Sequence, residues 1–224
     1  MSSSYLHFSS ITQKIWMAFL GAFLMIFLLV HLSINLFLLR QDDGLWFNAA
    51  AHFMGTNYVV KIFEVILFAG FIFHILLGII LQIKNWISRP VRYLVTNRTT
   101  TPFLSKYMIY TGGIVLFFLI IHFINFYFIK LGWVGDNAPR FEDGEPNFYV
   151  IAHQLFSMPG YSILYISLFI VLGFHLYHAF QSAFQSLGLN VKKYTQAIEK
   201  AGLIYSIIIP AGFIIIPIYF LFIK

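Results

Sequence analysis

The sequence predicts an all-α integral membrane protein: five transmembrane helices in one membrane domain that covers residues 1–224. Composition is the first observation behind this prediction, because 60% of the residues are apolar and only 10% are charged. Soluble domains carry about 25% charged residues. The second observation is that the charges gather in short stretches between long apolar runs, which is typical of polytopic membrane proteins.

Five apolar stretches are long enough to cross a bilayer, which takes roughly 20 residues in a helix. They cover residues 15–39, 59–83, 103–129, 161–184 and 204–223. The last contains Pro210 and Pro217, so a kink is expected there. Two shorter segments, 45–54 and 148–158, are only half apolar and are expected to lie at the membrane surface on one side.

The distribution of Lys and Arg predicts the orientation of the helices, since cytoplasmic loops are enriched in both residues. Nine lie on the side that includes the start of the first span: Lys14, Lys84, Arg89, Arg92, Arg98, Lys106, Lys192, Lys193 and Lys200. Five lie on the other side, together with most of the acidic residues: Arg40, Lys61, Lys130, Arg140 and Lys224. The N-terminus is therefore predicted to be cytoplasmic, and the basic residues indicate membrane topology rather than nucleic-acid binding.

The chain contains no cysteine. It therefore cannot hold an iron–sulfur cluster through thiolates or attach haem covalently through a C-x-x-C-H motif. Any haem must be held by axial ligands and packing alone.

Histidines recur inside the predicted spans, where an ionisable side chain is costly and usually functional. They are His31, His74, His122, His175 and His178, so four consecutive spans each carry at least one. A single such histidine is about as often a structural residue bonded to a neighbouring helix. Four consecutive helices that each carry one favour a shared function.

The depth of these residues sorts them into two levels. In the two spans that run outward, His31 lies eight residues before Leu39 and His122 lies seven before Ile129. In the two that run inward, His74 and His175 each lie nine residues before the end of the span. At 1.5 Å per residue, the outer and inner pairs differ in depth by roughly 10 Å. Two stacked haems, each with two axial imidazoles, require this arrangement.

Two questions stay open at this stage. His178 is three residues from His175 and shares its helix face, so spacing alone leaves either as the fourth ligand, and His178 could instead bond a haem propionate. Gly70 and Gly78 flank His74 on one face. They would leave room for a flat cofactor or would simply allow close helix packing, as glycine does in membranes.

The chain resembles the di-haem cytochrome b membrane anchors of succinate dehydrogenases and fumarate reductases along nearly its whole length. The resemblance lies in the stretches LVHLSIN, NAAAHFM, FIFHILLG, SRPVRYLV, IIHFINF and GFHLYHAFQSAFQSLGLN. The last is the most specific, and in the family its first histidine is the ligand, which favours His175. Family members often have glycine after the second histidine, where this chain has Ala179.

The resemblance implies that His31 and His122 ligate an outer b haem and that His74 and His175 ligate an inner one. The chain would be the electron-transfer subunit, without catalytic residues of its own, of a succinate:quinone oxidoreductase in the bacterial cytoplasmic (inner) membrane. Its partners would be a flavoprotein with FAD and an iron–sulfur subunit on the cytoplasmic face, and a dimer of the whole complex is compatible with this. Whether the complex oxidises succinate in the tricarboxylic acid cycle or reduces fumarate stays open.

The expected substrate is a quinone, and the resemblance to the di-haem type favours menaquinone. Its site is expected near the outer surface, where His52 and Glu64 are the candidates. Glu64 is the only acid inside a span, and a pair with Lys61 at i and i+3 is the simpler explanation for it. His52 is otherwise an ordinary residue of the membrane interface.

Three other functions compete with this one. The di-haem membrane subunit of a nitrate reductase also has about five spans, but it tends to place its ligands two to a helix. A transporter that uses histidine for protons or metal would not need its histidines to lie at two depths in the membrane. A purely structural anchor would bind no cofactor.

Overall fold

The computed structural model describes residues 10–87, 108–189 and 194–223, and in this part of the chain it is helical with no strand. Five of its helical segments are long and apolar enough to cross a membrane. They span Ile11–Leu39, Tyr58–Ile87, Met108–Lys130, Pro159–Ser186 and Thr195–Phe222. The predicted fold class is therefore confirmed, and the chain is an all-α integral membrane protein.

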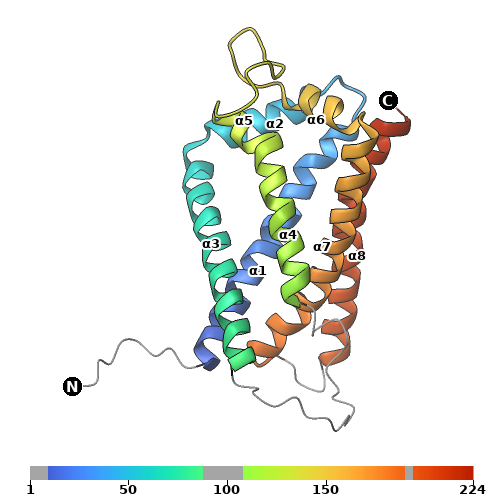
Figure 1. The fold of residues 1–224 in the computed structure, drawn as a ribbon. Helices are drawn as coiled ribbons and strands as arrows, with labels where there is room; N and C mark the ends of the chain where they lie inside the picture. Colours follow the sequence, from blue (N-terminus) through green and yellow to red (C-terminus); the bar gives the residue numbers. More distant parts are fainter. Residues whose placement is uncertain (1–9, 88–107, 190–193, 224) are drawn as a thin grey trace, which may run out of the picture.

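The spans run up and down in one bundle (Figure 1). The first is α1 (Ser10–Asn35), which ends in the 3₁₀ turn η1 (Leu36–Leu39); the second is α3 (Tyr58–Ile87). The third comprises α4 (Met108–His122), the π-helical segment η3 (Phe123–Tyr127) and α5 (Phe128–Lys130). The last two are α7 (Pro159–Ser186) and α8 (Thr195–Phe222).

Helix bounds differ most from the prediction at the start of α8, which begins nine residues before the predicted position 204. The segment from Thr195 to Ala201 is polar enough to end a hydrophobic span, yet its residues include Gln, Ala, Glu and Lys, which favour helix. The helix therefore continues beyond the apolar run. Residues 103–107 of the predicted third span lie outside the described residues.

The two half-apolar segments form short helices, α2 (Leu45–Thr56) and α6 (Phe148–Phe156). Both lie across the end of the bundle where the C-terminus is found (Figure 1), which is the predicted outer end. Asn48 joins them: its amide donates to Asn147 Oδ1 at 3.1 Å, and its Oδ1 accepts from the backbone N–H of Tyr149 at 3.1 Å. Asn147 Oδ1 also accepts from the N–H of Val150 and so caps α6.

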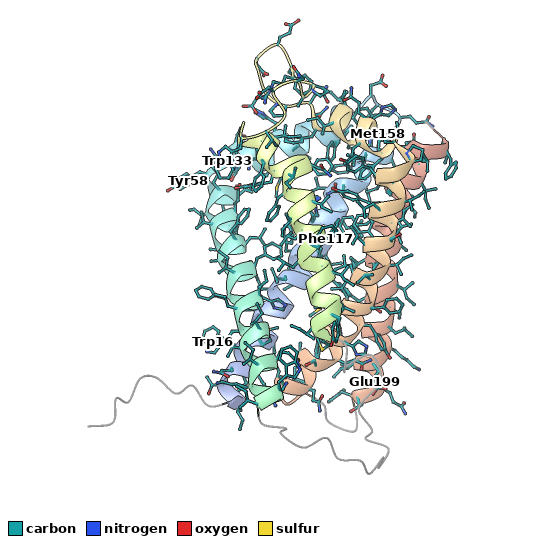
Figure 2. The ribbon with its side chains drawn as sticks, in the orientation of Figure 1. Trp16, Tyr58, Phe117, Trp133, Met158 and Glu199 are labelled. Atoms are coloured by element: carbon teal, nitrogen blue, oxygen red, sulfur yellow. The ribbon has the colours of Figure 1, made fainter. Side chains whose placement is uncertain are left out.

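Large aromatic side chains mark both ends of the bundle. Figure 2 places Tyr58 and Trp133 at the outer end and Trp16 near the inner end, with Phe117 between them. All four are exposed. Tyr and Trp collect at membrane–water interfaces, so their positions agree with a bilayer that covers the middle of the bundle. The orientation stays a prediction, since Arg89, Arg92, Arg98, Lys106, Lys192 and Lys193 lie outside the described residues.

The buried core lies on one side of the bundle. Its members come mainly from α1, α6, α7 and α8, and none of the described core residues comes from α3. α7 and α8 pack along their length, α3 packs mainly on α1, and α4 packs mainly on α7. In the most apolar part of each span, 39% of the residues are buried in α8, but none is buried in the third span. The two halves of the bundle are therefore packed very differently.

Gly173 allows a close contact between α7 and α8. A Cβ at this position would lie 3.0 Å from the backbone oxygen of Ser206 and 3.2 Å from Cγ of Pro210. Pro210 has no N–H to bond the Ser206 carbonyl four residues earlier, and α8 nevertheless continues through both prolines. The absence of a side chain at Gly173 lets α7 lie directly against this turn of α8.

We expect Gly173→Ala to destabilise the protein by about 1–3 kcal/mol, because the added methyl group overpacks a contact between two backbones. The measurement is thermal unfolding of the purified protein in detergent. Gly113→Ala is the matched control, since a Cβ at Gly113 would meet nothing within 4 Å. Equal stability of the two variants would contradict the assigned role of Gly173.

Candidate functional site

The four histidines expected to bind haem lie on four different helices. His31 is on α1, His74 on α3, His122 at the end of α4, and His175 on α7. Each side chain is half-buried within the bundle, whereas His178 is only 5% exposed. The helices therefore leave space beside these four rings that they do not leave beside His178.

The structure brings His31 and His122 together at the outer level. Their ring centroids are 5.8 Å apart, and the ring planes are nearly perpendicular, at 88°. Two imidazoles that bind one metal ion from opposite sides, with metal–nitrogen bonds of about 2 Å, have centroids roughly 6 Å apart. Direct edge-to-face packing of two rings gives a similar separation. The spacing of this pair is thus compatible with one metal ion between the two rings.

Aromatic rings surround the outer pair. Phe27 stacks on His31 at 5.2 Å, Phe213 lies 5.8 Å from His31, and Phe118 and Phe126 lie 5.8 and 5.2 Å from His122. These residues come from α1, α8, α4 and η3. These rings give the outer pair of histidines an apolar surrounding.

The inner level is expected to contain His74 of α3 and His175 of α7. Two glycines lie beside the rings. A Cβ at Gly112 would lie 3.5 Å from Cε1 of His175, and a Cβ at Gly21 would lie 3.9 Å from Cε1 of His74. Small residues therefore leave room beside both inner histidines.

Hydrogen bonding divides the histidines into two kinds. Nδ1 of His31 lies 3.5 Å from Nδ2 of Asn35, and Nδ1 of His175 lies 3.3 Å from the hydroxyl of Thr111. The Nδ1 atoms of His74 and His122 are buried and have no hydrogen-bond partner. Each pair thus combines a histidine whose ring has a polar neighbour with one whose Nδ1 is unpaired.

His178 differs from the other four in its surroundings. Its Nε2 is buried and has no hydrogen-bond partner, and its ring lies edge-on to Tyr177 at 5.1 Å. Because protein encloses this nitrogen, a metal ion has no open approach to it. The burial of His178 therefore favours His175 as the histidine that faces the open interior.

The glycines expected to leave room around His74 pack against α1 instead. A Cβ at Gly70 would lie 3.1 Å from Phe23, and one at Gly78 would lie 3.4 Å from Met17. They therefore serve close helix packing, which was the alternative left open by the sequence. The glycines beside the inner histidine rings are Gly21 and Gly112, and each lies on a different helix from the ring next to it.

Glu64 forms a polar cluster at the outer end. It accepts hydrogen bonds from the Tyr127 hydroxyl at 2.6 Å and from Lys130 Nζ at 2.8 Å. The partners are on the third span, so the cluster joins α3 to the end of the π-helical segment. Lys61, the partner expected from spacing, is exposed. His52, the other predicted quinone contact, lies exposed on α2.

The π-helical segment begins directly after His122 and determines which face the following residues take. In an α-helix, Tyr127 would lie about 140° around the axis from His122. In a π turn, where residues i and i+5 are bonded, the two share nearly one face. Asn125, within this segment, donates to the buried hydroxyl of Tyr165 on α7 at 3.0 Å. The segment therefore turns Tyr127, which binds Glu64, towards the side of the third span that carries His122.

No group of three or more His, Asp or Glu side chains comes together as a metal-ion site in the described parts of the chain. The histidines are instead grouped in twos, as axial ligation of haem needs. Comparison with protein-family models, curated proteins and solved structures found no match. The function must therefore be inferred from the residues of this chain.

The pairing of Glu64 with Lys130 rather than with Lys61 can be tested by replacing each lysine. We expect Lys130→Met to lower the free energy of unfolding by about 1.5–3 kcal/mol, because it removes a hydrogen bond between charged groups from a half-buried carboxylate. Lys61→Met, which removes an exposed charge, should change stability by less than about 0.5 kcal/mol. Denaturant unfolding in detergent measures both, and a larger effect of Lys61→Met would contradict the observed pairing.

Proposed function

We propose that this chain is the haem-bearing membrane anchor of a succinate:quinone oxidoreductase and carries electrons between an iron–sulfur subunit and quinone. The observation that carries the proposal is the arrangement of His31, His122, His74 and His175. Four spans each supply one half-buried imidazole, and the rings of His31 and His122 lie 5.8 Å apart. His74 and His175 are the pair expected at the inner level. These residues would supply four axial ligands for two b haems from one chain that contains no cysteine.

Loose packing of α3 and α4 supports the same proposal. These helices carry His74 and His122, yet α4 has no buried residue and α3 adds none to the described core. A helix in a bundle that packed only on other helices would bury one face. A flat, apolar cofactor between the helices would bury the faces that protein leaves open.

Two b haems, when bound, would supply one-electron carriers at two depths in the membrane. The residues of the chain would hold them: His31 and His122 at the outer level, and His74 and His175 at the inner level. The phenyl rings around the outer pair would exclude water, and the Thr111 hydroxyl beside Nδ1 of His175 would adjust that ligand. Moving an electron across a membrane potential is worth about 2.3 kcal/mol per 100 mV, which would couple the reaction to that potential.

Quinone chemistry needs protons as well as electrons, since reduction to quinol takes up two of each. Glu64 is the proposed proton-exchanging group, because it is a carboxylate within a span whose two oxygens are ordered by Tyr127 and Lys130. His52 is the second candidate, at the membrane surface. Menaquinone, an FAD-containing flavoprotein and an iron–sulfur subunit belong to the proposal through the family resemblance.

The first test is a dithionite-reduced minus oxidised visible spectrum of the purified protein, with haem counted per chain. Two b haems are expected. His31→Ala and His122→Ala should each lose the same haem, and His74→Ala and His175→Ala should each lose the other. His178→Gln is the control on the same helix and should keep both. Absence of haem from the wild-type protein would overturn the proposal in favour of a transporter or a structural anchor.

A second test concerns the quinone. In the intact complex, we expect Glu64→Gln to slow haem reduction by a menaquinol analogue roughly 100-fold, because a positioned acid–base group is lost, while both haems stay bound. Glu199→Gln is the matched control, since Glu199 is exposed at the opposite end of the bundle (Figure 2). Normal turnover in Glu64→Gln would exclude this carboxylate, and normal turnover in His52→Ala would exclude His52.

A further inference from the structure

Thr111 lies where α4 faces the inner histidine of α7. Its hydroxyl oxygen is 3.0 Å from the carbonyl oxygen of Met108 and 3.3 Å from Nδ1 of His175. Thr111 and His175 are 64 positions apart in the sequence and come from different helices. The contact is therefore a tertiary one, and no spacing rule along one helix predicts it.

The number of hydrogens and lone pairs on the Thr111 hydroxyl determines which atom donates in its contact with His175. A threonine hydroxyl has one hydrogen to donate and two lone pairs that accept. The carbonyl of Met108 can only accept, and it is the nearer partner, so it takes the hydroxyl hydrogen. The Thr111 oxygen is then left as an acceptor, and the bond to His175 forms when Nδ1 carries the ring hydrogen.

The tautomer of His175 follows from this direction. A neutral imidazole carries one hydrogen, so with Nδ1 protonated its Nε2 has a free lone pair. A metal ligand needs that lone pair, and an acceptor on the other ring nitrogen both orients the ring and makes it a stronger donor. His178 differs in the other ring nitrogen, because its Nε2 is buried without a hydrogen-bond partner and is enclosed by protein.

We infer that Thr111 is the positioning residue that selects His175, rather than His178, as the α7 ligand of the inner haem. This inference rests on the proposed function, since it concerns how the chain prepares one of the four ligands. Thr111 lies on α4, and His122 is the last residue of the same helix. One helix thus supplies a ligand at the outer level and a ligand-orienting group at the inner level.

The test compares Thr111→Val, which keeps the shape and removes the hydroxyl, with Thr111→Ser, which keeps the hydroxyl. Ser167→Ala is the matched control, because the hydroxyl of Ser167 bonds only the carbonyl of Ile163 on its own helix and is exposed. The two haems are measured separately by redox titration, and their loss to excess apomyoglobin is timed. The inner haem is identified as the one absent from His74→Ala.

In Thr111→Val, we expect the inner haem to be lost at least about 10-fold faster, as is usual when such a partner of a ligand is removed. Its midpoint potential should rise, because an imidazole without an acceptor stabilises the oxidised iron less. Thr111→Ser and Ser167→Ala should behave as the wild type, and the outer haem should be unchanged in all three.

Three results would overturn the inference while leaving the proposed function standing. These are an unchanged inner haem in Thr111→Val, an equal loosening of both haems, and a Thr111→Ser variant that behaves like Thr111→Val. A wild-type protein without haem would overturn the proposed function, and this inference with it.

Discussion

The close approach of α7 and α8 is the contact on which the rest of the bundle is built. In hydrocarbon there is no hydrophobic force between helices, so association depends on how closely their backbones and side chains pack. Gly173 allows α7 to lie against the turn of α8 that contains Ser206 and Pro210. α1 and α4 then pack on α7, and α3 packs on α1. The helices that carry the four histidines are therefore joined to this interface, either directly or through α1.

The helices around that interface pack unequally, and the histidines of the tightly and loosely packed helices differ in whether Nδ1 has a polar neighbour. α1 and α7 belong to the tightly packed side, and their histidines, His31 and His175, have polar neighbours at Nδ1. α3 and α4 are loosely packed, and the Nδ1 atoms of His74 and His122 are buried and unpaired. Each proposed haem would thus be held between a ring that the protein orients and a ring that the cofactor itself would help to fix.

Hydropathy and helix periodicity predicted the five spans, the two surface helices and the depths of the histidines, because these depend on the order of residues along each helix. They predicted that His31 and His122 share a level, but they did not predict the hydrogen bonds between helices, which depend on rotation and register. Glu64 illustrates this, since i and i+3 spacing favoured Lys61 whereas Tyr127 and Lys130 of another span bind it. The contact of Thr111 with His175 was not predicted either, because a threonine in an apolar span does not indicate which residue of another helix it will contact.

The π-helical segment after His122 explains how the outer end combines two kinds of group. One extra residue in the turn rotates Tyr127 towards the face of His122, and Asn125 within the turn is held by Tyr165 of α7. Without that rotation, Tyr127 would face away from the His122 side, and the hydroxyl would not be in place to bond Glu64. Under the proposed function, electrons arrive at His122 and protons exchange at Glu64, so this irregular turn is what brings the two within one region of the membrane.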